Sequence, residues 1–441
     1  MIDRLNSRLH LGATIAPILA LLASSAYSQQ SLVVKPLKAG GVYSVGEKAG
    51  WIVSVPPSAN GIAGSLRYTI KRNNHDVIKS GTIDLTGGSA TIEVVGDEPE
   101  MLYAEISQIT GLDGPRPNPR VFGAAIAPTR LRPVEPKPRD FDAFWKSKIK
   151  LLISTPMDAE LTPKESGKAN VDYATIKMNN INGGHVYGQV AKPKGEGKYP
   201  AMVIYQWASP PYPLQKSWVT DRAAEGWLVI NIEPHDVLPD APPTYYRGLP
   251  VELKNYGNIG REDREKCYFL QMYLADYRAV DYIASRRDWN GKTLVVTGTS
   301  MGGQQSVVVA GLHPKVTHLI VNEPSGCDLS SNQHGRQPGY PEFPMGNPKM
   351  VATAPYFDAI NFASHIRATS FVAMGFLDTI APPAGIWTAF NQIRGRKEAA
   401  PMFESPHNNT ATPAQQRPFT FRASEWFKAL VSGERIPAPS K

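Results

Sequence analysis

The sequence predicts an α/β fold, with a doubly wound and mostly parallel sheet, preceded by a small all-β sandwich. From residue 140 onward, continuous apolar runs alternate with amphipathic stretches at helical spacing, which is typical of a parallel sheet covered by helices on both faces. Between residues 29 and 127 the runs are shorter, alternate between apolar and polar residues, and are separated by turn residues, as in antiparallel strands. A proline-rich segment separates the two regions.

At the N-terminus, residues 1–28 are predicted to be a signal peptide. Two arginines precede the uncharged run LGATIAPILALLASSAYS, in which Ala26 and Ser28 are placed for cleavage before Gln29. A membrane anchor is the alternative, but the apolar core is short and a proline interrupts it. We therefore expect a secreted or periplasmic protein that has no membrane association after processing.

The first domain is expected over residues 29–127. Its strand-length runs are WIVSV, SLRYTIKR, GTIDL, SATIEVV and LYAEISQI. Their length and spacing predict an antiparallel sandwich of the immunoglobulin type. No pair of a nucleophile and a base stands out in this region, so we interpret it as an accessory domain.

Residues 128–139 are predicted to be a semi-rigid linker, because four prolines stand in the fourteen residues APTRLRPVEPKPRD. The second domain follows over residues 140–441. Its expected strands are VYGQVAKP, YPAMVIYQWA, WLVINIEP, TLVVTG, HLIVNEP and SFVAMGFLD. Its expected helices are DFDAFWKSKIKLLI, 268–286, one that begins near 301, and those near 356–366, 384–394 and 423–431.

A serine stands between a predicted strand and a predicted helix, in the pattern Gly298-x-Ser300-x-Gly302. The glycines permit a sharp turn and a close approach of helix to strand, while the serine side chain projects above the sheet edge. The alternative is that the glycines only ease a tight connection. The position after TLVVT and before GGQQSVVVAGL favours a chemical role, so Ser300 is the predicted nucleophile.

A serine hydroxyl needs a base, and the chain order expected in such a site is serine, acid, histidine. His407 in MFESPHNNT lies in a loop after the last predicted strand and is the predicted base, with an ordinary surface histidine as the alternative. Asp378 ends the strand SFVAMGFLD, at the same sheet edge as the serine, which makes it the predicted acid. Glu323, Asp328 and Asp358 are the alternatives, because they also lie between the serine and His407.

These motifs carry a resemblance that extends from about residue 138 to residue 431. The segments DFDAFWKSKI, HVYGQVAKPKGEGKYPAMV, GTSMGGQQ, NEPSGCD and MGFLDTIAPP follow one another as in the acetylxylan esterase and cephalosporin-C deacetylase family, carbohydrate esterase family seven, of the α/β-hydrolase fold. The chain resembles that family. The resemblance implies Ser300, Asp378 and His407 as the catalytic triad, and small O-acetyl esters such as acetylated xylan or oligosaccharides as substrates. This chemistry needs no metal or organic cofactor.

An oxyanion hole of two backbone N–H groups is also expected. Met301, the residue after the nucleophile, supplies one donor, and alignment with the family gives Ala208 as the other. The family's His-Gly pair and Arg-Gly-Gln motif are absent, since those places read YQWASPP and IEPHDVLPD, and Asn408 stands where a glutamate is usual. Trp207 and Tyr212, with the prolines between them, are expected to line a pocket that fits acetyl better than longer acyl groups.

Composition limits the partners. The formal net charge is +8, but the basic residues are scattered, which favours a solvated basic surface over a nucleic-acid interface. The two cysteines, Cys267 and Cys327, either form one disulfide or stay as buried thiols. Loop 326–350 is expected to form much of the substrate pocket. The oligomeric state does not follow from the sequence.

Two other functions stay open at this point. A secreted peptidase of the prolyl-oligopeptidase type would share the turn Gly298-x-Ser300-x-Gly302 and the fold. Such peptidases usually carry a propeller-like or other large N-terminal domain, and the first domain here is too small for a propeller. A non-catalytic carbohydrate-binding protein with a decayed hydrolase domain is a further hypothesis. The presence of all three triad residue types, in the expected order, argues against it.

Overall fold

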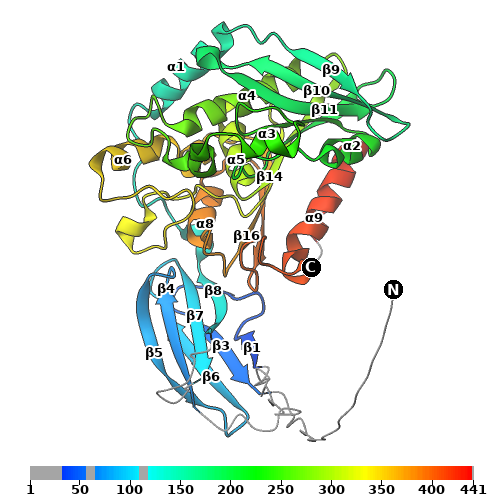
Figure 1. The fold of residues 1–441 in the computed structure, drawn as a ribbon. Coiled ribbons are helices and arrows are strands. Elements are labelled where there is room, and N and C mark those ends of the chain that lie inside the picture. The colour runs from blue at the N-terminus through cyan, green and yellow to red at the C-terminus, as the bar shows by residue number, and fades with distance from the viewer. Residues whose placement is uncertain (1–31, 56–64, 109–117, 440–441) are drawn as a thin grey trace, which may run out of the picture.

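The computed structural model of the chain describes residues 32–55, 65–108 and 118–439. The predicted signal peptide lies outside these residues. Two parts follow one another along the chain: an all-β part, blue to cyan in Figure 1, and a larger part of helices and strands directly above it. Among the described residues, no helix is both long and apolar enough to cross a membrane.

The all-β part consists of two sheets that share one apolar core. One sheet has the order β1-β3-β6 and the other β2-β8-β7-β4-β5, and every pair except β2 with β8 is antiparallel. Trp51, Ile70, Ile92 and Ile106 are buried between the sheets. The strands are β1 (Val33–Pro36), β2 (Val42–Tyr43), β3 (Lys48–Ser54), β4 (Ser65–Arg72), β5 (Asp76–Asp84), β6 (Ser89–Val95), β7 (Glu100–Gln108) and β8 (Arg120–Ile126). The immunoglobulin type stays a prediction.

The larger part is built on one nine-stranded sheet with the order β17-β16-β15-β14-β12-β13-β11-β10-β9. Its six strands from β17 to β13 are parallel, and β11, β10 and β9 add antiparallel at one edge. The prediction of a mostly parallel sheet is therefore confirmed. The strands are β9 (Glu160–Lys164), β10 (Val171–Asn179), β11 (His185–Pro193), β12 (Tyr199–Ile204), β13 (Leu228–Ile232), β14 (Trp289–Thr299), β15 (His318–Asn322), β16 (Thr369–Gly375) and β17 (Lys397–Met402).

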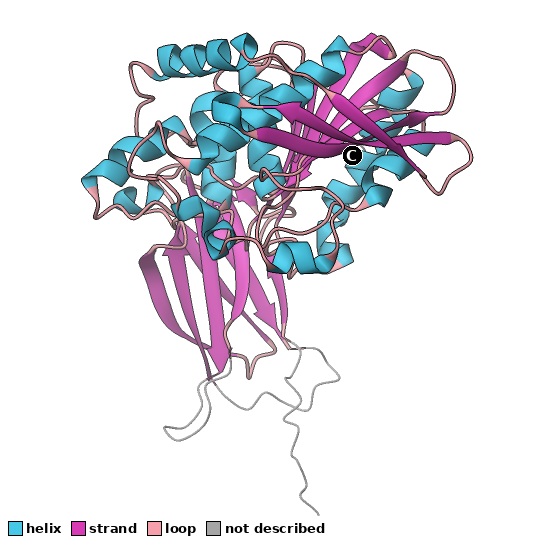
Figure 2. Ribbon diagram, turned by 45° about the horizontal axis from the view of Figure 1, so that its top comes forward, coloured by secondary structure: helices cyan, strands magenta, loops and turns pink. Residues whose placement is uncertain are grey.

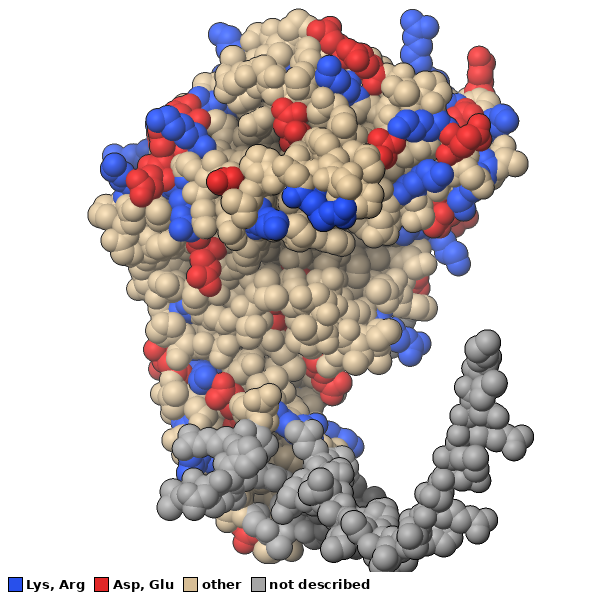
Figure 3. Space-filling model, in the orientation of Figure 1, with Lys and Arg blue, Asp and Glu red and all other residues tan. Residues whose placement is uncertain are grey.

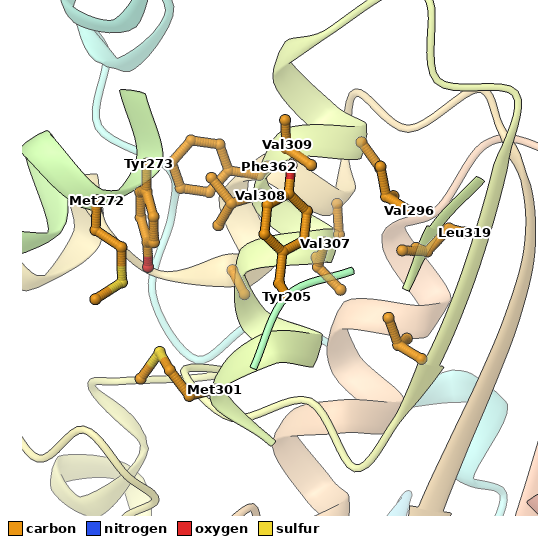
Figure 4. Close-up of a cluster of buried hydrophobic side chains, with 14 of the residues drawn as sticks. Tyr205, Met272, Tyr273, Val296, Met301, Val307, Val308, Val309, Leu319 and Phe362 are labelled. Atoms are coloured by element: carbon orange, nitrogen blue, oxygen red, sulfur yellow. The ribbon is translucent and has the colours of Figure 1, made fainter. Parts of the chain in front are cut away.

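Helices cover both faces of this sheet (Figure 2). Helices α2 and α9 pack on one face, where Val219 and Trp426 join strand residues in a common cluster. The helices of the other face share a second cluster, which surrounds α5, and Figure 4 shows Tyr205, Tyr273 and Phe362 packed around it. The helices are α1 (Phe141–Ser154), α2 (Lys216–Ala224), α3 (Pro243–Arg247), α4 (Tyr268–Ser285), α5 (Met301–Leu312), α6 (Pro348–Thr353), α7 (Ala359–Ala363), α8 (Pro383–Gln392) and α9 (Pro413–Ser432).

Some elements differ from the sequence prediction. Helix α9 begins ten residues before the predicted range, because Thr412 and Gln415 form a capping box and Pro413 stands at the first helical position. Strands β9, β10 and β17 were not expected. The outermost of them, β9, is exposed at every residue and so lacks the apolar alternation that marks a strand.

Charged side chains are mixed in sign over the surface. On the face shown in Figure 3, Lys and Arg are interspersed with Asp and Glu. Pairs such as Lys148 with Glu265, and Arg222 with Glu225, are part of this pattern. The distribution matches the scattered basic residues of the sequence, while the expectation about nucleic acid stays a prediction.

Candidate active site

Ser300 lies at a sharp turn between β14 and α5. Its φ of 56° and ψ of −118° are unfavourable for a residue with a side chain, so the surrounding packing must hold the turn. A Cβ atom on Gly302 would lie 2.2 Å from the backbone oxygen of Tyr205, and one on Gly298 would lie 2.4 Å from the backbone of Gly302. Both glycines are therefore required by the close approach of α5 to β14 and to the segment after β12.

The three predicted triad side chains meet at the carboxyl end of the sheet. His407 Nε2 lies 2.9 Å from Ser300 Oγ, and His407 Nδ1 lies 2.7 Å from Asp378 Oδ2. Asp378 follows β16 and His407 follows β17, so adjacent parallel strands bring them to one edge. This row can pass a proton from the serine hydroxyl to the imidazole while the carboxylate holds the ring.

The carboxylate and the ring are each fixed by further contacts. Asp378 Oδ1 accepts hydrogen bonds of 2.8 Å from the N–H groups of Ile380 and Ala381. The carbonyl of His407 accepts from the N–H of Thr410 at 2.9 Å. Burial lowers the pKa of His407, but the hydrogen bond and charge of Asp378, together with the charge of Glu323, outweigh it and raise that pKa above 6.5.

A second carboxylate, that of Glu323, lies beside the triad. It follows β15, has a φ of 46°, and places Oε2 3.8 Å from His407 Nδ1. Its oxygens accept hydrogen bonds of 2.8 Å from the N–H of Asn408 and from Nε2 of Gln416. Burial, and next the charge of Asp378, raise the pKa of Glu323 to about 7. Its end-of-strand position was visible in the sequence, but Asp378 is the acid that bonds His407.

Glu323, Asp378 and His407 are also residue types that ligate metals. Glu323, Asp378 and His407 each offer a ligand atom, and these atoms lie within 4.8 Å of one another. However, His407 Nδ1 is engaged with Asp378, and both oxygens of Glu323 accept N–H donors. The donors around the site therefore suit carboxylates that orient an imidazole better than carboxylates that ligate an ion.

The predicted triad opens, through Ser300 and His407, on a cavity of about 1190 Å³. Ser300, His407, Met301, Ala208 and Trp207 are all among its lining residues. Further lining residues come from the segment after β12, from α2, from the region before α4 and from α9: Gln206, Ser209, Ser217, Trp218, Asp221, Arg222, Glu225, Lys254, Tyr256, Phe419 and Phe427. The cavity thus extends from the triad to the gap between α2 and α9.

Two pocket expectations differ in detail from the structure. Of loop 326–350, Tyr340 is the residue that lines the cavity, so this loop contributes less of the wall than expected. Tyr212 is not among the lining residues but stacks on Trp207, with 4.7 Å between ring centroids, and its hydroxyl donates to the Trp207 carbonyl at 3.1 Å. Tyr212 therefore supports Trp207, which lines the cavity, and does not line the cavity itself. Trp207 is 46% exposed.

The two predicted oxyanion donors border the serine. Met301 is the first residue of α5, and Ala208 is buried in the segment after β12, with its carbonyl bonded by His235 Nε2. The side chain of Gln305 donates to the carbonyl of Gln206 at 2.8 Å and so ties the same segment to α5. Among the backbone hydrogen bonds that the described residues form in turns, loops and caps, neither the Met301 N–H nor the Ala208 N–H is a donor.

The two cysteines do not form a disulfide with each other. Cys267 and Cys327 are both buried and free, as in the second of the two alternatives. Burial raises the pKa of the Cys267 thiol to about 12, which disfavours the nucleophilic thiolate at neutral pH.

Comparison with known proteins adds independent findings. A model of the acetyl xylan esterase family (AXE1) matches residues 129–424. The acetyl esterase Axe7A of Xylanibacter ruminicola is 29% identical over 373 residues, which cover 82% of this chain and 84% of that protein. The residues after 127 make up a smaller share of the chain than this, so the similarity includes part of the all-β region.

Two solved structures share the fold. The acetyl xylan esterase from Paenibacillus sp. R4 gives a TM-score of 0.58 at 23% identity, covering 68% of this chain and 98% of that chain. Acetyl Xylan Esterase 1 from Thermoanaerobacterium sp. JW/SL YS485 gives 0.55 at 19% identity, covering 69% and 97%. In both comparisons the match covers nearly all of the other, shorter protein, so the additional residues of this chain lie outside the shared fold.

Proposed function

The chain belongs to the acetyl xylan esterase family and is a serine carboxylic-ester hydrolase, and we propose that it removes small acyl groups, above all acetyl, from carbohydrate esters such as acetylated xylan or oligosaccharides. One observation carries this proposal: Ser300, His407 and Asp378 form a hydrogen-bonded row that opens on a large cavity. The family supports acetyl-ester hydrolysis, and the row supplies the residues that would perform it.

In the proposed mechanism, His407 Nε2 takes the proton of Ser300 as the serine oxygen attacks the ester carbonyl. Asp378 keeps Nδ1 protonated and stabilises the imidazolium. The N–H groups of Met301 and Ala208 donate to the oxyanion, a contribution that typically amounts to about a hundredfold or more in rate per donor. His407 then gives its proton to the leaving alcohol, an acyl-enzyme remains, and a water activated by His407 releases the acid.

The composition of the cavity wall supports a carbohydrate as the alcohol part. Trp207 and Trp218 present rings, with 6.1 Å between centroids, and Asp221, Arg222 and Lys254 add polar groups nearby. Aromatic faces together with a few polar groups suit a ligand that has apolar ring faces and many hydroxyls. A cavity of about 1190 Å³ has room for more than one sugar unit.

The acyl part is proposed to be small. Trp207 precedes the proposed donor Ala208 and is backed by Tyr212, so its ring cannot move far without disturbing that stack. Each added methylene on the acyl chain would then displace packed atoms at a cost of roughly 1–3 kcal/mol. Acetyl fits this limit better than butyryl. Membership of an esterase family also favours ester over peptide substrates.

We further propose where the protein acts and how the chain is divided into domains. The chain is processed near Gln29 and exported, to the periplasm or the exterior. Its parts are a sandwich domain over 29–127, a linker over 128–139 and a catalytic domain over 140–441.

The test of the proposed function is acetate release by the purified mature protein. Acetylated xylan, acetylated xylo-oligosaccharides and a deacetylated control would be compared, with Ser300→Ala as the inactive reference. Acetate from the acetylated samples alone supports the proposal. Turnover of p-nitrophenyl acetate with no acetate from any acetylated carbohydrate would overturn the substrate class and leave the esterase activity in place.

A further inference from the structure

The turn between β4 and β5, which contains Asn73 and Asn74, forms a tip of the all-β part. Asn73 and Asn74 have φ values of 47° and 48°, in the left-handed region that asparagine tolerates better than most residues. Asn73 is tied to β7 twice: its N–H donates to the Met101 carbonyl at 2.7 Å, and its side-chain oxygen accepts from the Met101 N–H at 2.9 Å. The tip therefore presents the Asn73 carbonyl and the Asn74 side chain in fixed positions.

Gln337 of the larger part receives this tip. Its N–H donates to the Asn73 carbonyl at 3.0 Å, and its Oε1 accepts from Nδ2 of Asn74. Its Nε2 donates to the carbonyl of Thr379 at 2.8 Å. One glutamine side chain thus connects the β4–β5 turn to the residue that directly follows Asp378.

The connection continues to the cavity wall. The N–H of Tyr340 donates to the carbonyl of Ile380 at 2.8 Å, and both residues line the cavity beside Ser300. Ile380 in turn donates its N–H to Asp378 Oδ1. The segment that Gln337 holds is therefore both a wall of the cavity and the turn that orients the acid.

A second contact supports the same segment. A Cβ atom on Gly123 of β8 would lie 2.6 Å from Cβ of Phe376, two residues before Asp378, so the two backbones are in close contact. Figure 1 shows the all-β part directly beneath β16 and α8, the elements on either side of this segment. The segment is therefore held between β8 and the Gln337 link.

We propose that the all-β part is a positioning element of the active site, in which Asn74 acts through Gln337 to hold Tyr340 and the turn after Asp378. The inference rests on the proposed function for the roles of Asp378 and of the cavity. It assigns to the all-β part a share in substrate binding, beyond an accessory role.

The test removes the side-chain hydrogen bond between Asn74 and Gln337 and keeps the backbone conformation of the turn. Asn74→Gly removes the side-chain donor and keeps the left-handed conformation, because glycine tolerates positive φ. Gln337→Met keeps the length of the side chain and removes its hydrogen bonds. The matched control is Thr86→Ala, which removes a side-chain hydrogen bond to Asp84 at the opposite end of β5. The wild type, these three variants and the Asn74→Gly/Gln337→Met double variant are assayed as the mature chain with p-nitrophenyl acetate, so the measurement does not depend on the natural substrate.

Loss of one or two such hydrogen bonds should lower kcat/KM by about three- to tenfold in Asn74→Gly and Gln337→Met, with a rise in KM. The double variant should be no worse than Gln337→Met alone, because both act through one link. A merely structural role would reduce the active fraction, which lowers kcat and leaves KM unchanged. An unchanged KM, an equal effect in Thr86→Ala, or additive losses would each overturn the proposal.

Discussion

Replacing Glu323 by glutamine should change the pH dependence of stability in a calculable way. The carboxyl is buried, and its pKa is raised from the usual 4.5 to about 7. Between these values the folded state binds more protons than the unfolded state, so the free energy of unfolding falls as pH rises. The cost of ionising this buried group is absent below pH 4.5 and fully present above pH 7.

The shift corresponds to about 3 kcal/mol at roughly 1.4 kcal/mol for each unit of pKa. Glutamine cannot ionise, so the Glu323→Gln variant escapes this cost at high pH. Its amide also places N–H groups against one of the two existing donors, but that penalty does not depend on pH. The stability difference between variant and wild type should therefore move in favour of the variant by about 3 kcal/mol from pH 4.5 to pH 8.

Thermal unfolding of both proteins from pH 4.5 to pH 8 measures this. At about 2 °C for each kcal/mol in a domain of this size, the difference in Tm should grow by about 6 °C. Glu404→Gln, at an exposed glutamate near the histidine loop, serves as the control and should leave the two curves parallel. Parallel curves for Glu323→Gln would refute the argument. Because Glu323 helps to raise the pKa of His407, the acid limb of the kcat/KM profile should also shift to lower pH in this variant.

Three further predictions concern the reaction itself. Ser300→Ala should lower kcat by about 10⁴-fold or more with an unchanged circular dichroism spectrum, and activity within tenfold of the wild type would exclude Ser300 as the nucleophile. His407→Ala should lower kcat as much as Ser300→Ala, and Asp378→Asn should lower it somewhat less. If Glu323→Gln lowered kcat more than Asp378→Asn, Glu323 and not Asp378 would be the acid of the triad. The wild type should cleave p-nitrophenyl acetate with a higher kcat/KM than p-nitrophenyl butyrate. Trp207→Ala should reduce the ratio of the acetate kcat/KM to the butyrate kcat/KM. A wild type that prefers the butyrate would contradict the small acyl site.

The arrangement of the three candidate site residues could be predicted from the sequence better than the contacts of the residues around them. The sharp turn at Ser300 could be predicted because its glycines meet a local steric requirement, the close approach of α5 to Tyr205. The meeting of Asp378 and His407 could be predicted because parallel strands end at one edge. The link from Asn74 to Gln337 could not, since it joins residues 263 positions apart through a loop without periodicity. The strand β17 was missed as well, because Glu398 and Pro401 interrupt its apolar pattern.

The open edge of the large sheet has a consequence for the protein at high concentration. Strand β9 is exposed along its whole length, and an exposed edge is a template to which a strand of another molecule can add. Here Pro163 has no amide hydrogen to offer, and Glu160 and Lys164 place charge at either end of the strand. An incoming strand would meet an interrupted row of donors and would bury charge. These features of β9 oppose the addition of a strand from another molecule at this edge of the sheet.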